Sequence, residues 1–248
     1  MIRIRLDRSA DQPWSPARQL ALDEALLNAA QAGQIGSSFR TWELHQPSVV
    51  LGRSSKLRIE TDPDFCKRNG IDIYRRCSGG ASIVGGPGCL MYSVVLAISD
   101  HPQTGKIDGA HTFVMQRVLA AARCQLPGIE MQGICDLTWN NQKFSGNALR
   151  ITRSHVLYHG TILYAADLAL IAACLATAPR QPDYRQGRDH SDFVTNAPLE
   201  PQRFAVDLAA EFQVDDGPLA TAVQADLLRA VDELQRDRYG CQNWRDRH

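Results

Sequence analysis

The stretch "GIDIYRRCSGGASIVGGPGCLMYSVVLAI", residues 70–98, joins two strand patterns through a glycine-rich loop. Residues 71–76 alternate apolar and polar side chains, which is typical of a half-buried strand. Residues 89–98 are almost continuously apolar, which indicates a buried strand. A loop that is tied to strands at both ends is held rigidly, so its residues are candidates for a binding site.

The loop itself, residues 75–88, contains two arginines and five glycines. Glycine lets backbone N–H groups approach a ligand closely, and the arginine guanidinium fits phosphate or carboxylate. The pattern therefore indicates an anion-binding loop, and an ordinary surface turn is the alternative. It is not the dinucleotide-binding fingerprint, because no helix follows the glycines directly, and no P-loop GK[ST] is present.

Composition excludes several classes of protein. The 248 residues suffice for a substantial core, and Lys plus Arg equals Asp plus Glu at 27, so no global field favours nucleic acid or an anionic membrane. The seven cysteines form no CxxC pair, which argues against a zinc site or a disulfide framework. No signal-peptide pattern or membrane-span length is found, so we expect a cytoplasmic protein.

Helical patterns lie towards both ends of the chain and strand patterns in the middle. Helices are expected from Ser15–Pro16 onward, at 59–69, 110–124 and 167–175, and as two segments beyond residue 200 that stop at Gly240. Further strands are expected at 39–44, 48–53, 134–139, 143–152 and 155–164, and an arginine-rich loop at 179–190. This order predicts an α+β fold, a sheet domain flanked by helices.

Two further stretches carry candidate chemistry. In "CDLTWNNQKFSGNALR", residues 135–150, Lys143 leaves a polar turn and is followed by Ser-Gly-Asn, so its charge could enter a cleft floored by bare backbone. A solvated hairpin lysine is the alternative. In "LYHGTILY", residues 157–164, His159 and Gly160 interrupt an apolar strand, which marks either the close approach of a ligand or a bulge.

Together these stretches resemble the lipoate-protein ligase A family, within the wider biotin/lipoate ligase group. The family pattern RRxSGGGAV…G…YS is similar to Arg75, Arg76, Ser78, Gly79, Gly80, Gly88, Tyr92 and Ser93. The pattern NDL…KxSGxA is similar to Asp136, Leu137, Lys143, Ser145, Gly146 and Ala148, and HHGTLL…DL to His159, Gly160, Thr161, Leu163, Asp167 and Leu168. Upstream, VxGR is similar to Val50, Gly52 and Arg53, and DPW…E to Gln12, Pro13, Trp14 and Glu24.

The chain departs from the family pattern at three places. Ala81 replaces the third glycine of the triplet, and Gly85-Gly86 stands where the family usually has His-Asp. Larger members carry a separate C-terminal domain, whereas here we expect a ligase-like catalytic domain over 1–200 and a helical extension over 201–248 packed on it. The resemblance implies a mixed, largely antiparallel sheet flanked by helices. These departures bear on which substrate the protein prefers and on whether it acts without a further domain or subunit, more than on the fold.

The resemblance implies that lipoate or octanoate reacts with ATP and Mg²⁺ to an acyl-adenylate, which is transferred to a lysine of a lipoyl-carrier domain. A monomer without a tightly bound metal is expected, and the need for a separate accessory subunit stays open. Lys143 is implied as the catalytic residue, bridging the acyl carbonyl and the phosphate. The implied ATP and lipoyl-adenylate site comprises Arg53, Arg75, Arg76, Ser78, Gly79, Gly80, Ala81, Ser82, Ile83, Val84, Asp136, Lys143, Ser145, Gly146, His159, Gly160 and Thr161.

Two other functions stay open. The first is a cysteine-dependent octanoyl or lipoyl transferase that needs no ATP, with Cys135 as the nucleophile. In related transferases the nucleophile precedes the "DL" motif by several residues, whereas Cys135 abuts this motif directly. Neighbouring side chains on a strand point to opposite faces, so Cys135 would face away from the site if Asp136 faces the site. The second is a non-catalytic module that binds lipoate or a lipoyl domain, against which the retained Lys143 and arginines argue.

Overall fold

The computed structural model describes residues 1–6, 13–176 and 181–248. Gln12 of the N-terminal motif and the first two residues of the loop expected at 179–190 lie outside the described residues. Within the described part of the chain, no helix is long and apolar enough to cross a membrane.

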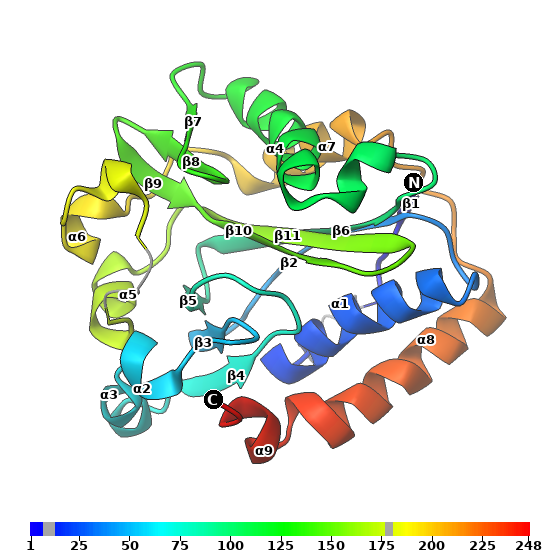
Figure 1. Cartoon of the computed structure of the whole chain (residues 1–248), viewed down its shortest axis with the longest axis horizontal. Coiled ribbons are helices and arrows are strands. Elements are labelled where there is room, and N and C mark those ends of the chain that lie inside the picture. The colour runs from blue at the N-terminus through cyan, green and yellow to red at the C-terminus, as the bar shows by residue number, and fades with distance from the viewer. Residues whose placement is uncertain (7–12, 177–180) are drawn as a thin grey trace.

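A five-stranded sheet forms the centre of the molecule (Figure 1). Its strand order is β1 (Ile2–Arg3), β2 (Ser38–Glu43), β6 (Cys89–Ala97), β11 (His155–Leu163) and β10 (Asn147–Ile151). Only the β1–β2 pair is parallel. One face is covered by α4 (Ile107–Arg123) and α7 (Pro201–Glu211), and the other by α1 (Pro16–Gln31), with α8 (Thr221–Leu234) packed on the outer side of α1 (Figure 1). The predicted α+β class is therefore confirmed.

Two three-stranded sheets flank one end of the central sheet. The first has the order β4 (Asp72–Arg75), β3 (Ser48–Leu51) and β5 (Ile83–Gly85), and the second the order β7 (Glu130–Gln132), β8 (Asp136–Trp139) and β9 (Gln142–Ser145). The β3–β4 pair is parallel and the other pairs are antiparallel. The strands are mixed and largely antiparallel as expected, although they form three sheets rather than one.

The sequence pattern merged two strands that the structure separates. Residues 143–152 were expected as one strand, but β9 ends at Ser145 and β10 begins at Asn147, in another sheet. Gly146 is the link, and a Cβ built there would stand 3.0 Å from Lys143 Cε. A glycine therefore lets the chain change sheets directly beneath the Lys143 side chain.

The helix expected at 59–69 is also wrong, because two short helices occupy this region: α2 (Leu57–Glu60) and α3 (Pro63–Arg68). Thr61 between them is extended, and the carboxylate of Asp62 caps α3 by accepting from the backbone N–H of Phe65. Proline at the first position of a helix disfavours helical geometry in the residue before it, which separates the two segments.

Short elements complete the chain. They are η1 (Pro102–Gly105), α5 (Leu168–Cys174), η2 (Asp183–Arg185), α6 (His190–Phe193), η3 (Gln235–Tyr239) and α9 (Gln242–Arg245). The sequence patterns did not predict β1, β5, β7 or α9, since two to four residues are too few to show a period.

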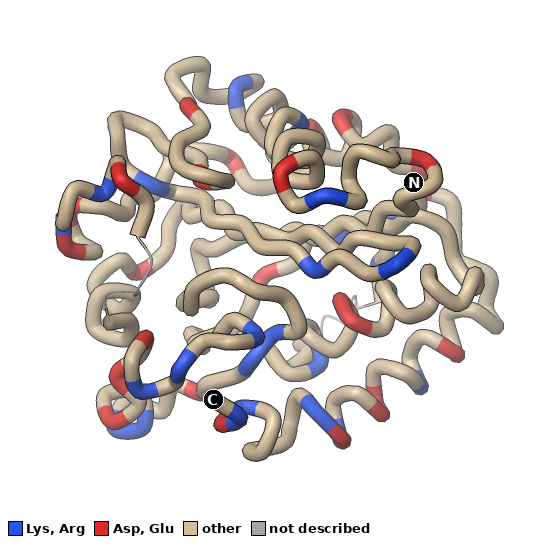
Figure 2. Tube along the Cα trace, viewed as in Figure 1, with Lys and Arg blue, Asp and Glu red and all other residues tan. Residues whose placement is uncertain are grey.

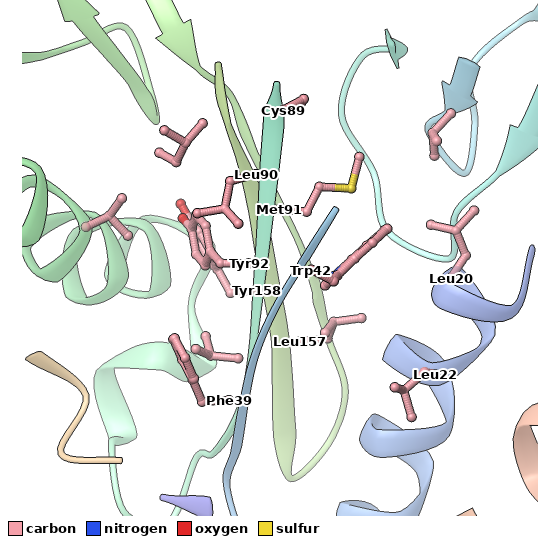
Figure 3. Packing of buried hydrophobic residues seen from close by; sticks show 14 of the residues in the cluster. Leu20, Leu22, Phe39, Trp42, Cys89, Leu90, Met91, Tyr92, Leu157 and Tyr158 are labelled. Atoms are coloured by element: carbon pink, nitrogen blue, oxygen red, sulfur yellow. The ribbon is translucent and has the colours of Figure 1, made fainter. Parts of the chain in front are cut away.

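Alternation along β6 divides the core into two layers (Figure 3). Leu90 and Tyr92 point to the side of the sheet that also holds Phe39, whereas Met91 points to the side that holds Trp42 and faces α1 (Figure 3). The side chains of this strand are almost all buried. Charged residues of both signs are interspersed along the outer helices and loops (Figure 2).

The C-terminal helices lie on both sides of the central sheet. Helix α7 packs on α4, and α8 packs on α1. Phe204, Leu227 and Tyr239 belong to the same hydrophobic cluster as the central strands. The boundary expected at residue 200 stays a prediction.

Candidate active site

Two adjoining cavities lie where the three sheets meet. The first cavity encloses about 670 Å³ and the second about 810 Å³, with their open mouths included. Ala81, Ser82 and Ile83 of the glycine-rich loop line both, as do Lys143, Gly146 and Thr161. The two cavities are therefore halves of one cleft, with the loop on one wall and Lys143 at their junction.

Lys143 is held at this junction by its backbone and by its side chain. Thr195 donates its N–H to the Lys143 carbonyl over 2.9 Å, which ties β9 to the segment after α6. The ammonium lies 2.8 Å from Asp136 Oδ1, and 29% of the side chain is exposed. A partly exposed lysine above a bare glycine can turn towards a ligand in either cavity, because among the described residues a single ion pair, with Asp136, restrains it.

Asp136 lines the first cavity from β8. Its second oxygen, Oδ2, accepts a hydrogen bond of 2.8 Å from the hydroxyl of Tyr184. Burial raises the pKa of Tyr184, and the Asp136 charge raises it further, so the phenol stays a donor. Asp136 thus has one oxygen on Lys143 and the other on a tyrosine, and its position is fixed.

The two loop arginines lie in different surroundings. Arg76 lines the first cavity, and its guanidinium donates to the carbonyls of Val50, Gly79 and Ala81. Burial lowers the pKa of Arg76 to about 10, so at neutral pH it stays charged. Arg76 therefore folds the loop on itself and also brings positive charge to the cavity wall.

Arg75 is completely buried and lines neither cavity. Its guanidinium donates to the carbonyls of Gly52, Arg53 and Ser55 and, at 2.6–3.1 Å, to those of Trp244 and Arg245. The expectation that both arginines present charge to a ligand is thus not met by this arrangement, because backbone carbonyls far along the chain surround the Arg75 group.

The other predicted site residues divide in the same way. All of them line one cavity or the other except five: Arg53, Arg75, Ser78, Gly79 and Gly80. Gly79 and Gly80 are exposed at the tip of the loop, whereas Ser78 is buried beneath it. The structure therefore brings together the loop segment 81–84, the 136–146 region and the 159–161 strand, as the sequence motifs indicated.

The two glycines at the tip predict different tolerances. Gly80 has a φ of +83°, and an added Cβ would lie 2.9 Å from Arg76 Nη2, whereas a Cβ at Gly79 meets nothing within 4 Å. Gly80→Ala should weaken the binding of a ligand in the first cavity about tenfold, since the backbone strain at a positive φ and the contact of the new Cβ with Arg76 together shift the Arg76 side chain. Gly79→Ala should leave this affinity unchanged. Titration calorimetry on both variants tests this, and equal affinities would contradict it.

Several cavity residues were not predicted. Glu60 lines the second cavity and accepts from the N–H and the hydroxyl of Ser82 and from the hydroxyl of Ser55. Asn147 lines the first cavity, accepts from Tyr92 Oη and donates to the carbonyl of Cys135 over 2.7 Å. Asn147 directly follows Gly146 of the motif, so its position in the sequence is a signal from which it could have been predicted as a site residue. Glu60 gives no local signal, because its partners lie elsewhere in the chain.

Cys135 lines neither cavity, and its sulfur lies 3.4 Å from the carbonyl oxygen of Asn147. Burial, and with it the charge of the neighbouring Asp136, raises the pKa of Cys135 to about 11 and outweighs the opposing effect of Lys143. The thiol is therefore neutral at physiological pH. Among the described residues, no group of three or more His, Cys, Asp or Glu is arranged to hold a metal ion.

Comparison with solved structures finds the same fold. One chain of a bipartite lipoate protein ligase system from Thermoplasma acidophilum superposes with a TM-score of 0.76 at 21% identity, covering 95% of this chain and 93% of that one. A T. acidophilum protein with bound lipoic acid gives 0.75 at 21% identity, covering 96% of each chain. A lipoate-protein ligase A bound with ATP gives 0.72 at 22% identity, covering 94% of each.

Sequence relatives carry two kinds of name. "Probable lipoate-protein ligase A" of Mycoplasma genitalium is 27% identical over 163 residues, 65% of this chain and 47% of that protein. Octanoyltransferase LipM of Geobacillus kaustophilus is 28% identical over 180 residues, 63% of this chain and 64% of that protein. The chain thus spans about half to two thirds of the length of these relatives. The model of the lipoyl protein ligase A/B catalytic domain matches residues 15–204, and the chain belongs to that family.

Proposed function

We propose that the protein activates lipoate or octanoate with ATP to an acyl-adenylate and transfers the acyl group to a lysine of a lipoyl-carrier domain. The observation that carries the proposal is the position of Lys143 at the junction of two cavities with different linings. Such a lysine can touch the carboxylate of one substrate and the phosphate of the other. Fixed positive charge at that point is what the joining of two anions requires.

The first cavity suits the acyl chain. Leu20, Trp42 and Met91 give it an apolar wall on the side of α1, and Asp136 and His159 give it a polar end. A saturated chain gains about 0.8 kcal/mol for each CH₂ that it buries in such a lining. The carboxylate then lies at the polar end, within reach of the Lys143 ammonium.

The second cavity suits the nucleotide. Leu175 and Val194 give it partly exposed apolar surface for a base, and Arg185 and His190 line it with donors for phosphate or ribose. The glycine-rich loop lies between the cavities, so its backbone can approach the α-phosphate. ATP brings its own Mg²⁺, bound to phosphate oxygens, as part of the substrate.

The reaction then has two steps. A carboxylate oxygen attacks the α-phosphorus and pyrophosphate leaves, while Lys143 stabilises the charge that develops on the pentacoordinate phosphorus. In the second step the acceptor lysine, as its neutral amine, attacks the acyl carbonyl, the nitrogen releases one further proton to solvent, an amide forms and AMP leaves. Lys143 exchanges its contact with Asp136 for contacts with the carbonyl and phosphate oxygens in both steps.

The acceptor is proposed from the relatives. The T. acidophilum structure is described as a bipartite ligase and its E2 lipoyl domain, and a relative from that organism is named subunit 1 of a lipoate-protein ligase A. We infer a lipoyl domain as acceptor here, and a separate accessory subunit as a candidate partner.

The test is pyrophosphate release from ATP in the presence of lipoate or octanoate, with and without a lipoyl domain. Release that depends on the acid, together with a mass gain of one acyl group on the domain, supports the proposal. If the partner subunit is required, release appears only when it is added. An acyl gain without ATP, from an acylated carrier protein, would contradict it.

A second candidate function is supported by the LipM relatives, because they are named octanoyltransferases and match at the same level of identity. It would use Cys135 as a nucleophile that forms a thioester and releases the carrier thiol. The burial of Cys135 and its neutral thiol argue against that role, since the thiolate is the reactive form.

Cys135→Ser therefore separates the two candidates. We expect the variant to keep at least about half of the ATP-dependent acylation, because a pKa of about 11 leaves little thiolate at neutral pH. Intact-protein mass spectrometry after incubation with an acyl donor and no ATP should find no acyl group on the wild type. A hydroxylamine-labile acyl group on Cys135, absent from Cys135→Ser, would establish the transferase instead.

A further inference from the structure

Three polar side chains form a row across the face of the central sheet that α1 covers. Arg40 on β2 pairs in register with Ser93 on β6, and Ser93 pairs with His159 on β11. Arg40 and Ser93 are buried, and 12% of the His159 side chain is exposed, where it reaches the first cavity. Polar groups in such a layer require partners, because an unpaired one costs free energy.

One carboxylate on α1, that of Asp23, is the common partner of the row. Its Oδ1 accepts from Ser93 Oγ over 2.7 Å and from Arg40 Nη1 over 3.2 Å, and its Oδ2 lies 2.9 Å from His159 Nδ1. Burial raises the pKa of Asp23, but the His159 hydrogen bond and the Arg40 charge outweigh it and hold the pKa below its usual value. Asp23 is thus ionised and only accepts.

The proton of His159 follows from this. An ionised carboxylate donates no hydrogen bond, so Nδ1 of His159 carries the proton. On the other side of the ring, Nε2 lies 2.5 Å from Ser78 Oγ, and that oxygen also accepts from Arg76 Nε over 3.0 Å. The Ser78 hydroxyl donates to Nε2. Arg76 Nε, Ser78 Oγ and His159 Nδ1 then each donate to an acceptor in this row of hydrogen bonds.

The chain of hydrogen bonds therefore runs from α1 through the sheet to the glycine-rich loop. It passes from Asp23 to His159, Ser78 and Arg76, and Arg76 in turn binds the loop carbonyls of Gly79 and Ala81. The order Asp-His-Ser matches that of serine hydrolases. Ser78, however, is 1% exposed, lines neither cavity and accepts from a guanidinium, so it positions its neighbours and does not attack a substrate.

We propose that Asp23 is a positioning residue of the active site. It fixes the Nδ1-protonated tautomer of His159 and, through Ser78 and Arg76, holds the loop that forms a wall of the first cavity. The identity of the ligand in that cavity rests on the proposed function, whereas the tautomer does not.

The first measurement is the tautomer of His159 in the full chain labelled with ¹⁵N-histidine, by two-bond ¹H–¹⁵N correlation at about pH 8. His159→Gln assigns the signal. The wild type should show Nδ1 protonated, and Asp23→Asn should show loss of that state or a mixture. Glu24→Gln is the matched control, because Glu24 is buried on the same helix but pairs with Arg150, Arg238 and Tyr239.

The second measurement is the affinity for lipoyl-sulfamoyl adenosine, a non-reactive analogue of the acyl-adenylate. Asp23→Asn and Ser78→Ala should each bind about tenfold more weakly than the wild type, and Glu24→Gln within about twofold. Ser78→Ala should keep the His159 tautomer, because Asp23 still binds Nδ1. Glu24→Gln also removes a buried charge, so any general loss of stability should appear in it as well. A change of tautomer and affinity in Asp23→Asn that is absent from Glu24→Gln therefore reports positioning.

The following outcomes decide the proposal. A wild-type His159 protonated on Nε2, or an Asp23→Asn protein with unchanged tautomer and affinity, overturns it. If Asp23→Asn does not fold because Arg40 loses its counter-charge, the wild-type tautomer and the Ser78→Ala affinity decide instead. If the wild type binds no adenylate analogue, the proposed function fails, and the tautomer in the wild type and variants still decides the role of Asp23.

Discussion

Lys143→Met is expected to lower the rate of acid-dependent pyrophosphate release by roughly 100- to 1000-fold, the usual cost of removing one preorganised donor from a charged transition state. Methionine keeps the length of the side chain and removes the charge. The fold should survive, because the Lys143–Asp136 pair is partly exposed and such pairs contribute little to stability. Stopped-assay rates together with a thermal melt measure both effects.

Lys106→Met is the control for this variant, since Lys106 is an exposed lysine at the start of α4 and lines neither cavity. It should keep the wild-type rate. A Lys143→Met protein that releases pyrophosphate as fast as Lys106→Met would remove Lys143 from the mechanism. Lys143 would then be a hairpin lysine with a surface ion pair.

Gly160→Ala should abolish binding in the first cavity and lower the melting temperature by roughly 5–10 °C. A Cβ at Gly160 would stand 1.8 Å from Asn147 Oδ1 and 2.7 Å from Tyr92 Cε1. Both atoms belong to buried or half-buried groups that bond to each other, so neither can move away freely. The two strands β10 and β11 must separate at this point, and the cavity wall moves with them.

Differential scanning calorimetry and ligand titration measure the Gly160→Ala effects. Gly36→Ala is the matched control, because a Cβ there meets nothing within 4 Å and the backbone needs no special dihedral. The interpretation of Gly160 as a point of close approach would be wrong if the two alanine variants melted at the same temperature and bound equally well.

The sequence predicted the parts of the fold and site whose signals are local. Alternation before the loop and the apolar run after it gave the strands β4 and β6, and motif order brought Lys143, Asp136 and His159 to one cleft. Strand patterns are set by neighbouring side chains. Asp136 and Lys143 lie on the paired strands β8 and β9, and His159 lies on β11 of the central sheet, so the motif residues meet where two sheets adjoin.

Long-range partners explain what could not be predicted. Arg75 and Arg76 are adjacent and chemically identical, but the acceptors of Arg75 include carbonyls 169 and 170 residues away. The contacts of Asp23 likewise join helix α1 to three strands. A pattern within a few residues does not contain such partners, so it gave both arginines one role and Asp23 none.

The carbonyls that surround Arg75 also make the end of the described chain part of the loop's own stability. Trp244 Nε1 donates back to the Arg75 carbonyl over 2.8 Å, so the two segments are bonded in both directions. Opening of residues 244–245 breaks the hydrogen bonds between the Arg75 guanidinium and the Arg245 carbonyl and the bond from the Trp244 indole, so we expect the strand that leads into the glycine-rich loop to loosen with it. We therefore expect the two segments to unfold locally as one cooperative unit, and their amide protons to exchange together.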